Sequence, residues 1–82
     1  MMTSDQMNQQ KKQFGLLVKA ARRHGGFGSY ADLAASVNCS IEDIKSIEVG
    51  NATCDYATIL RVCSVLGIPS DAAEIYDPDI IY

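Results

Sequence analysis

The chain has 82 residues, of which 48% are hydrophobic and 21% are charged, and its formal net charge at pH 7 is -3. This length is enough for one domain with one modest core and too short for two, and the composition excludes a disordered chain. Apolar runs are too short to span a membrane, and the N-terminal residues lack the apolar core of a signal peptide, so we expect a cytosolic protein without a membrane partner.

The charges are distributed unevenly along the chain. Residues 1–40 carry five Lys and Arg side chains against two Asp, a net charge of +3, whereas residues 41–82 carry two against eight carboxylates, a net charge of -6. Any surface that binds nucleic acid must therefore draw its positive charge from the first half of the chain. The overall acidity counts against DNA binding, although a local basic face matters more than the total.

Apolar periodicity predicts a long first helix. Thr3 followed by Gln6 fits a capping box at its start. Its apolar side chains recur at intervals of three and four residues, at Phe14, Leu17, Val18 and Ala21. The run Gly25-Gly26-Phe27-Gly28 ends the helix, because Gly destabilises a helix interior and tolerates the backbone angles of a helix exit.

A short second helix is predicted from Ser29 to Val37. Ser29 and Asp32 have the spacing of a capping box. Asn38 should close this helix with a sharp turn at Asn38-Cys39, since Asn accepts the left-handed conformation better than most residues other than Gly.

A short third helix is predicted from Ser40 to Val49. Ser40 and Asp43 form another possible capping box, and apolar Ile residues follow at positions 41, 44 and 47. Gly50 supplies a stop signal. Only a few residues would therefore separate the second helix from the third.

Two further helical segments are predicted. Asp55 can cap a fourth helix that Gly67 ends. Ser70 could cap a last turn or two through Ile75, which Asp77-Pro78 should terminate. Neither a repeat nor strand-like alternation occurs along the chain, so the sequence predicts an all-α fold.

Two short helices joined by a turn of three or four residues have the geometry of a helix-turn-helix, in which the second helix lies in the major groove. The residues that carry this pattern are Ser29-Tyr30-Ala31-Asp32-Leu33-Ala34, Val37-Asn38-Cys39-Ser40, Ile44, Glu48, Gly50, Thr58-Ile59-Leu60 and Leu66-Gly67-Ile68. In this order and spacing, over about two-thirds of the chain, they resemble the Cro/lambda-repressor-like (XRE-type) family. The resemblance implies a compact bundle of four to five helices in a single domain over residues 1–82, with a core from about 13 to 68 and a C-terminal extension over 69–82.

The resemblance further implies a sequence-specific DNA-binding transcriptional regulator, a repressor of phage, plasmid or small bacterial type. The residues expected to contact double-stranded DNA are Ser29, Tyr30, Ser40, Ile41, Glu42, Lys45, Ser46 and Asn51. Of these, Ile41 could contact a thymine methyl group, Glu42 could accept from cytosine N4, and Lys45 could meet guanine or a phosphate. The family pattern also implies a structural ion pair between Arg22 and Glu48.

Family members usually carry Gln, Gly and Pro at the positions where this chain has Tyr30, Asn38 and Cys54. In the family, that Gln commonly supports a contact to a phosphate or a base. This chain lacks it, although Tyr30 can still donate to a phosphate. Glu42 and Asp43 place two carboxylates on the expected groove face, with only Lys45 to offset them. The alternative function is a protein-binding module of the same fold, an antirepressor or accessory factor that binds another regulator, and the acidic second half favours it.

Homodimers are expected, because one such domain covers little DNA and helix-turn-helix proteins commonly bind two half-sites. The candidate dimer surface is the apolar tail formed by Ile75, Tyr76, Ile80, Ile81 and Tyr82. The alternative interpretation is that this tail folds over the core of its own domain.

The chemistry-bearing residues do not indicate an enzyme. Three cysteines, Cys39, Cys54 and Cys63, match no zinc or redox spacing, and only His24 could add a nitrogen ligand. We therefore predict small buried thiols in a reducing compartment, with no metal site and no cofactor. Spacings typical of Ser-His-Asp, Cys-His or phosphate-loop sites are also missing from the sequence.

Overall fold

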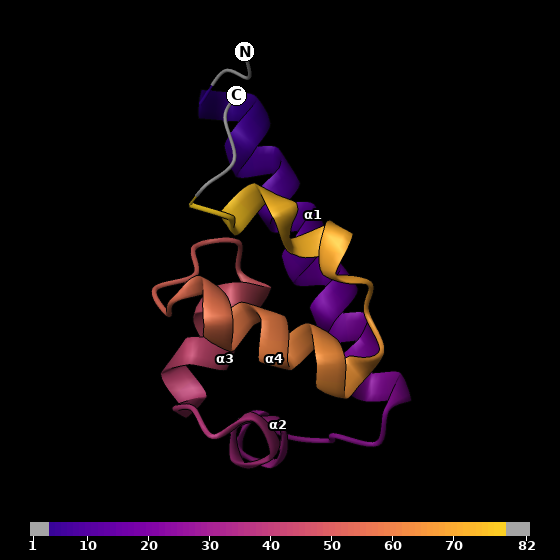
Figure 1. Cartoon of the computed structure of the whole chain (residues 1–82). Coiled ribbons are helices and arrows are strands. Elements are labelled where there is room, and N and C mark those ends of the chain that lie inside the picture. The colour runs from indigo at the N-terminus through magenta and orange to yellow at the C-terminus, as the bar shows by residue number, and fades with distance from the viewer. Residues whose placement is uncertain (1–3, 79–82) are drawn as a thin grey trace.

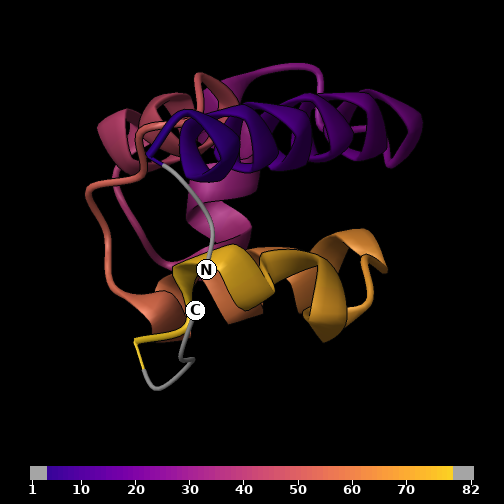
Figure 2. The same ribbon diagram turned by 90° about the horizontal axis from the view of Figure 1, so that it is seen from above.

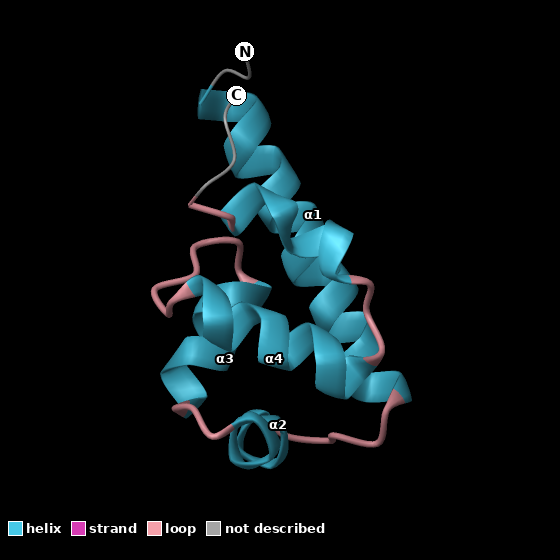
Figure 3. Cartoon of the chain, in the orientation of Figure 1, coloured by secondary structure: helices cyan, strands magenta, loops and turns pink. Residues whose placement is uncertain are grey.

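The computed structural model describes residues 4–78, and every regular element among them is a helix (Figures 1 and 3). The elements are α1 (Ser4–His24), α2 (Tyr30–Val37), α3 (Ile41–Glu48), α4 (Tyr56–Leu66) and the 3-10 helix η1 (Ser70–Tyr76). The prediction of an all-α bundle of four to five helices is thus confirmed. In the described part of the chain, none of the helices is long and apolar enough to cross a membrane.

The starts of α2 and α3 are capped by the predicted side chains. The Ser40 hydroxyl accepts from the Asp43 N–H at 3.1 Å, and the Asp43 carboxylate accepts from the Ser40 N–H at 3.3 Å, so this capping box is complete. At α2, the Ser29 hydroxyl accepts from the Asp32 N–H at 3.2 Å. Each bond satisfies a backbone donor that the first turn of a helix leaves without a partner. The predicted capping box of the first helix includes Thr3, which lies outside the described residues.

Left-handed residues end α2 and α4. Asn38 has φ 56° and ψ 52°, and its N–H donates to carbonyl groups of the last turn of α2. Within residues 4–78 it is the only residue other than glycine with a positive φ. Gly67 ends α4 in the same conformation, at φ 72°. Both stops agree with the sequence prediction, because Asn and Gly tolerate this backbone region best.

The helices enclose a single hydrophobic core. Its buried members are Phe14, Val18, Leu33, Ala34, Val37, Ile44, Ile47, Ile59, Val62, Cys63, Ile68 and Ala73. Figure 2 shows α1 along one side of the molecule and α4 with η1 along the other, with α2 spanning the space between them. This arrangement leaves the outer face of α3 at the edge of the molecule.

α1 and α3 cross with their backbones in close contact. Gly15 of α1 lies against the last turn of α3, where a Cβ atom would overlap the Glu48 carbonyl oxygen and stand 2.7 Å from that of Ile47. Gly50, just after α3, has φ 84°, and a Cβ there would lie 2.8 Å from the Lys12 Cα. Glycine at these two positions therefore allows the two helices to approach.

The C-terminal segment belongs to the core. Ala73 of η1 is fully buried and Ile75 is also buried. The ring of Tyr76 makes an edge contact with Phe14 of α1, with their centroids 5.9 Å apart. The core therefore extends past residue 68, where the sequence placed its boundary. The N-terminus of η1 has no side-chain capping bond, so the cap predicted at Ser70 is not formed.

Two residues of the apolar tail can be placed. Ile75 is buried within its own chain, and Tyr76 is half-buried against the core. Burial within its own chain therefore contradicts the place of Ile75 on an exposed dimer surface, whereas the contribution of Tyr76 and the homodimer itself stay predictions. Ile80, Ile81 and Tyr82 lie outside the described residues.

Candidate nucleic-acid interface

Three of the predicted contact residues of α3, Ile41, Glu42 and Lys45, share the face of the helix that turns away from the core. Ile44 and Ile47 are fully buried, and the helical period then directs the neighbouring positions outward. Glu42 and Lys45 are exposed, and Ile41 is 39% exposed. One carboxylate and one apolar side chain at the start of α3 and one ammonium group in its last turn therefore make up this face.

Tyr30 connects the start of α2 to this face. Its ring centroid lies 5.6 Å from the Lys45 Nζ and 4.8 Å from the Arg22 Cζ, so two cations contact one phenol ring. The structure thus brings the predicted residues Tyr30 and Lys45 together, an arrangement that the sequence did not predict. An aromatic ring at this position holds the Lys45 ammonium group close to the N-terminus of α2.

The predicted ion pair between Arg22 and Glu48 is confirmed. The Arg22 Nε donates to the Glu48 Oε2 at 2.8 Å and Nη2 donates to Oε1 at 3.4 Å, in the paired geometry that guanidinium and carboxylate groups favour. Nη1 donates to the Phe27 carbonyl oxygen at 2.9 Å. Both charged side chains are buried, so each cancels most of the field of the other and Arg22 adds little positive charge to the surface.

Ser46 makes structural contacts within the chain, and its predicted role in base reading stays a prediction. Its hydroxyl donates to the Asp43 carbonyl oxygen at 2.7 Å and accepts from the Thr53 N–H at 3.2 Å. The side chain therefore ties α3 to the loop that follows it. Asn51 in that loop is exposed, and its N–H donates to the Ser46 carbonyl oxygen at 2.9 Å, which leaves its side chain at the surface.

The two carboxylates of α3 occupy different surroundings. Asp43 is half-buried and engaged in the capping box, whereas Glu42 is exposed. Burial, and after it the charge of Asp43, raises the pKa of Cys39 and raises the pKa of Cys54 to about 11. The charge of Asp43 therefore acts on these thiols, whereas the carboxylate of Glu42 is exposed at the surface.

We expect Cys54 to react slowly with iodoacetamide at pH 8. A pKa of about 11 instead of 9.0 leaves roughly a hundred-fold less thiolate, which is the reacting form. The fold favours the neutral thiol, so its contribution to stability is complete below pH 9 and is lost as the pH rises through 11. Alkylation of the folded and the urea-unfolded chain, followed by peptide mass spectrometry, measures the ratio of rates. Equal rates at Cys54 in the two states would contradict the prediction.

Two exposed apolar residues near the crossing of α1 and α3 were not predicted as part of a site. Val49 is 67% exposed and stands one helical turn beyond Lys45, and Leu16 is 64% exposed. Leu16 directly follows Gly15, and Val49 directly follows Glu48. Gly15 and Glu48 are in contact where α1 and α3 cross. The spacing of four residues from Lys45 to Val49 is the sequence signal that could have identified Val49.

Within residues 4–78, no group of three or more His, Cys, Asp or Glu side chains could hold a metal ion. Protein-family models, curated proteins and solved structures gave no match to this chain.

Proposed function

We propose that the chain is a sequence-specific DNA-binding regulator of the cytoplasm, in which α2, the turn 38–40 and α3 act as a helix-turn-helix. The observation that carries this proposal is the contact between Lys45 Nζ and the Tyr30 ring, 5.6 Å from its centroid. Through it, the ammonium group of α3 and the N-terminus of α2 form one surface beside Ile41. A phosphate and a base edge could be contacted together from this surface.

Backbone and side-chain donors would hold the phosphates. The N–H groups of Tyr30 and Ala31 have no partner within α2 by helix geometry, and the helix dipole adds partial positive charge there. Lys45 supplies a full charge close by. The exposed amide of Asn51 offers a further donor from the loop after α3. These contacts would fix the register of α3 on the duplex without reading sequence.

Base reading would fall to the first turn of α3. Ile41 can contact the methyl group of thymine, and the exposed Glu42 can accept from the N4 amino group of cytosine. Glu42 also repels phosphates, so the proposed regulator should bind with modest affinity and with a marked dependence on salt.

The proposal is tested by the binding of purified protein to genomic DNA fragments at low and moderate salt. We expect Lys45→Ala to weaken binding about ten-fold and to reduce the slope of log K against log salt by about 1. Lys11→Ala is the matched control, because it removes the same charge from a side chain that lies over the Tyr76 ring, 5.4 Å from its centroid, on the side of η1. Failure of the unsubstituted protein to bind at low salt, or equal losses in both variants, would reject the proposal.

A protein-binding module is the second candidate, and the exposure of Val49 and Leu16 favours it. Two large apolar side chains beside the α1–α3 crossing are suited to contact with another protein. Under this alternative, Val49→Ser would abolish capture of a regulatory partner, whereas Lys45→Ala would leave capture unchanged. DNA binding that is sensitive to Lys45 but not to Val49 would favour the first candidate.

A further inference from the structure

One face of α1 carries three positive charges that do not belong to the proposed DNA contacts. Lys12, Lys19 and Arg23 lie on the same side of the helix, because residues four, seven and eleven positions apart return close to one direction. Lys12 and Arg23 are exposed, and Lys19 is half-buried. From Gln6 to His24 the helix contains no carboxylate. This face, which we call the α1 stripe, is therefore cationic over about 16 Å of helix length.

The charges of the α1 stripe have no counter-charge in the described part of the chain. Among residues 4–78, none of the three side chains makes a hydrogen bond or an ion pair. Lys19 and Arg23 are four residues apart, a spacing at which like charges destabilise a helix. A bound polyanion would remove this repulsion, so the stripe is suited to an anionic partner.

The α1 stripe begins where α1 meets the loop after α3. A Cβ atom at Gly50 would lie 2.8 Å from both the Cα and the Cγ of Lys12, so the stem of this lysine runs over the glycine. The next residue, Asn51, is exposed and belongs to the proposed DNA surface. Gly15, which follows Lys12 by three residues, contacts Glu48 at the end of α3. The stripe therefore continues the proposed DNA surface across the α1–α3 crossing.

We propose that the α1 stripe is a second phosphate-contacting surface, which binds the DNA backbone beyond the phosphates held by α2 and Asn51. This inference rests on the proposed DNA binding and adds a contact that lies outside the helix-turn-helix. Each cation of the stripe neutralises a phosphate and contacts no base, so it adds affinity without sequence preference. The stripe thereby offsets the repulsion between Glu42 and the backbone.

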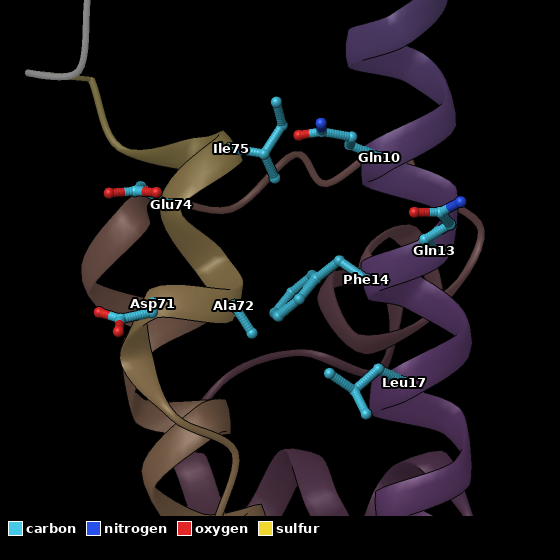
Figure 4. A pocket seen from close by; sticks show the side chains of 8 residues that line it. All are labelled: Gln10, Gln13, Phe14, Leu17, Asp71, Ala72, Glu74 and Ile75. Atoms are coloured by element: carbon cyan, nitrogen blue, oxygen red, sulfur yellow. The ribbon is translucent and has the colours of Figure 1, made fainter.

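The groove side of α1 differs from the stripe in its charge. A groove of about 440 Å³ separates α1 from η1 there, with Gln10, Gln13 and Leu17 along its α1 edge (Figure 4). Across the groove, η1 carries the carboxylates of Asp71 and Glu74. Phosphates are repelled from such a side and attracted to the stripe. The distribution of charge on the two sides of α1 therefore favours one orientation of the domain on a duplex.

The test measures how salt changes binding to the genomic fragment that the unsubstituted protein binds most tightly. The triple variant Lys12→Gln, Lys19→Gln, Arg23→Gln should reduce the slope of log K against log salt by about 3, because three phosphate contacts are lost. Its affinity should fall about a hundred-fold or more, while its order of preference among fragments stays the same. Thermal denaturation checks that the triple variant is folded.

Two neighbouring lysines supply a matched pair of single variants. Lys12→Gln should reduce the slope by about 1, whereas Lys11→Gln should leave it unchanged, because Lys11 lies over the Tyr76 ring on the side of η1. Neutral methylphosphonate links, placed singly along the bound duplex, then locate the contact. One link should weaken binding of the unsubstituted protein but not of Lys12→Gln, and it should lie next to the link that has this relation to Asn51→Ala.

The outcomes separate this inference from the proposed function. Binding that depends on Lys45 but keeps its salt slope in the triple variant would overturn the inference alone, and an acidic protein would then be the remaining ligand for the stripe. Equal slopes in Lys11→Gln and Lys12→Gln would overturn it as well, since only net charge would matter. Failure of the unsubstituted protein to bind at low salt would reject both proposals.

Discussion

Replacing Glu48 with Ala lowers the free energy of unfolding by about 3–5 kcal/mol, because the Arg22 guanidinium is left buried without its counter-charge. Two of its three hydrogen bonds go to Glu48, and only the bond to the Phe27 carbonyl would remain. Thermal or urea denaturation measures the change directly.

Two further variants distinguish the effect of the unpaired buried charge on stability from the effect of lost packing. Arg23→Ala removes an exposed charge next along α1 and should change stability by less than about 0.5 kcal/mol. The double variant Arg22→Met, Glu48→Leu removes both buried charges and should be more stable than Glu48→Ala. A Glu48→Ala chain as stable as the Arg23→Ala chain would contradict the role assigned to the pair.

Replacing Gly15 with Ala should cost about 3 kcal/mol, although Ala is the better helix former by about 1 kcal/mol. The added methyl group would overlap the Glu48 carbonyl oxygen, and the backbone of α3 cannot move aside as a flexible side chain would. The variant must therefore separate α1 from α3 and strain the ion pair beside the crossing. Urea denaturation should show a lower midpoint with an unchanged slope.

Gly28→Ala is the control for this substitution. A Cβ at Gly28 meets no atom within 4 Å, and its φ does not lie in the left-handed region. This change should be neutral or should stabilise slightly, because Ala has less conformational freedom to lose on folding. If Gly15→Ala were as harmless as Gly28→Ala, the close backbone contact would not limit the position of α1.

The helix boundaries could be predicted because their causes are local. A capping bond such as that from Asp43 N–H to Ser40 joins residues three apart, and the left-handed stop at Asn38 depends on one residue and its neighbours. Local patterns of this kind are fully present in a sequence window of four or five residues. The cap expected at Ser70 failed because that segment forms a 3-10 helix without a side-chain cap.

The contacts between distant segments could not be predicted in the same way. Lys45 over the ring of Tyr30 and Thr53 bonded to Ser46 both depend on how packed helices and loops meet in space. The ion pair of Arg22 with Glu48 joins residues 26 positions apart, and it was predicted only through the family resemblance. Gly15 had one visible signal, a glycine in a helix interior, which usually has a packing reason.

The edge contact of Phe14 with Tyr76 also has a consequence for synthesis of the chain on the ribosome. α1 is made well before its neighbour η1 across the core, since η1 ends at residue 76. Until then the nascent chain exposes the apolar face of α1. Arg22 also has no counter-charge until Glu48 has been made. The core can therefore close only after η1 has emerged from the ribosome, so chains interrupted before residue 76 should leave few stable partial products.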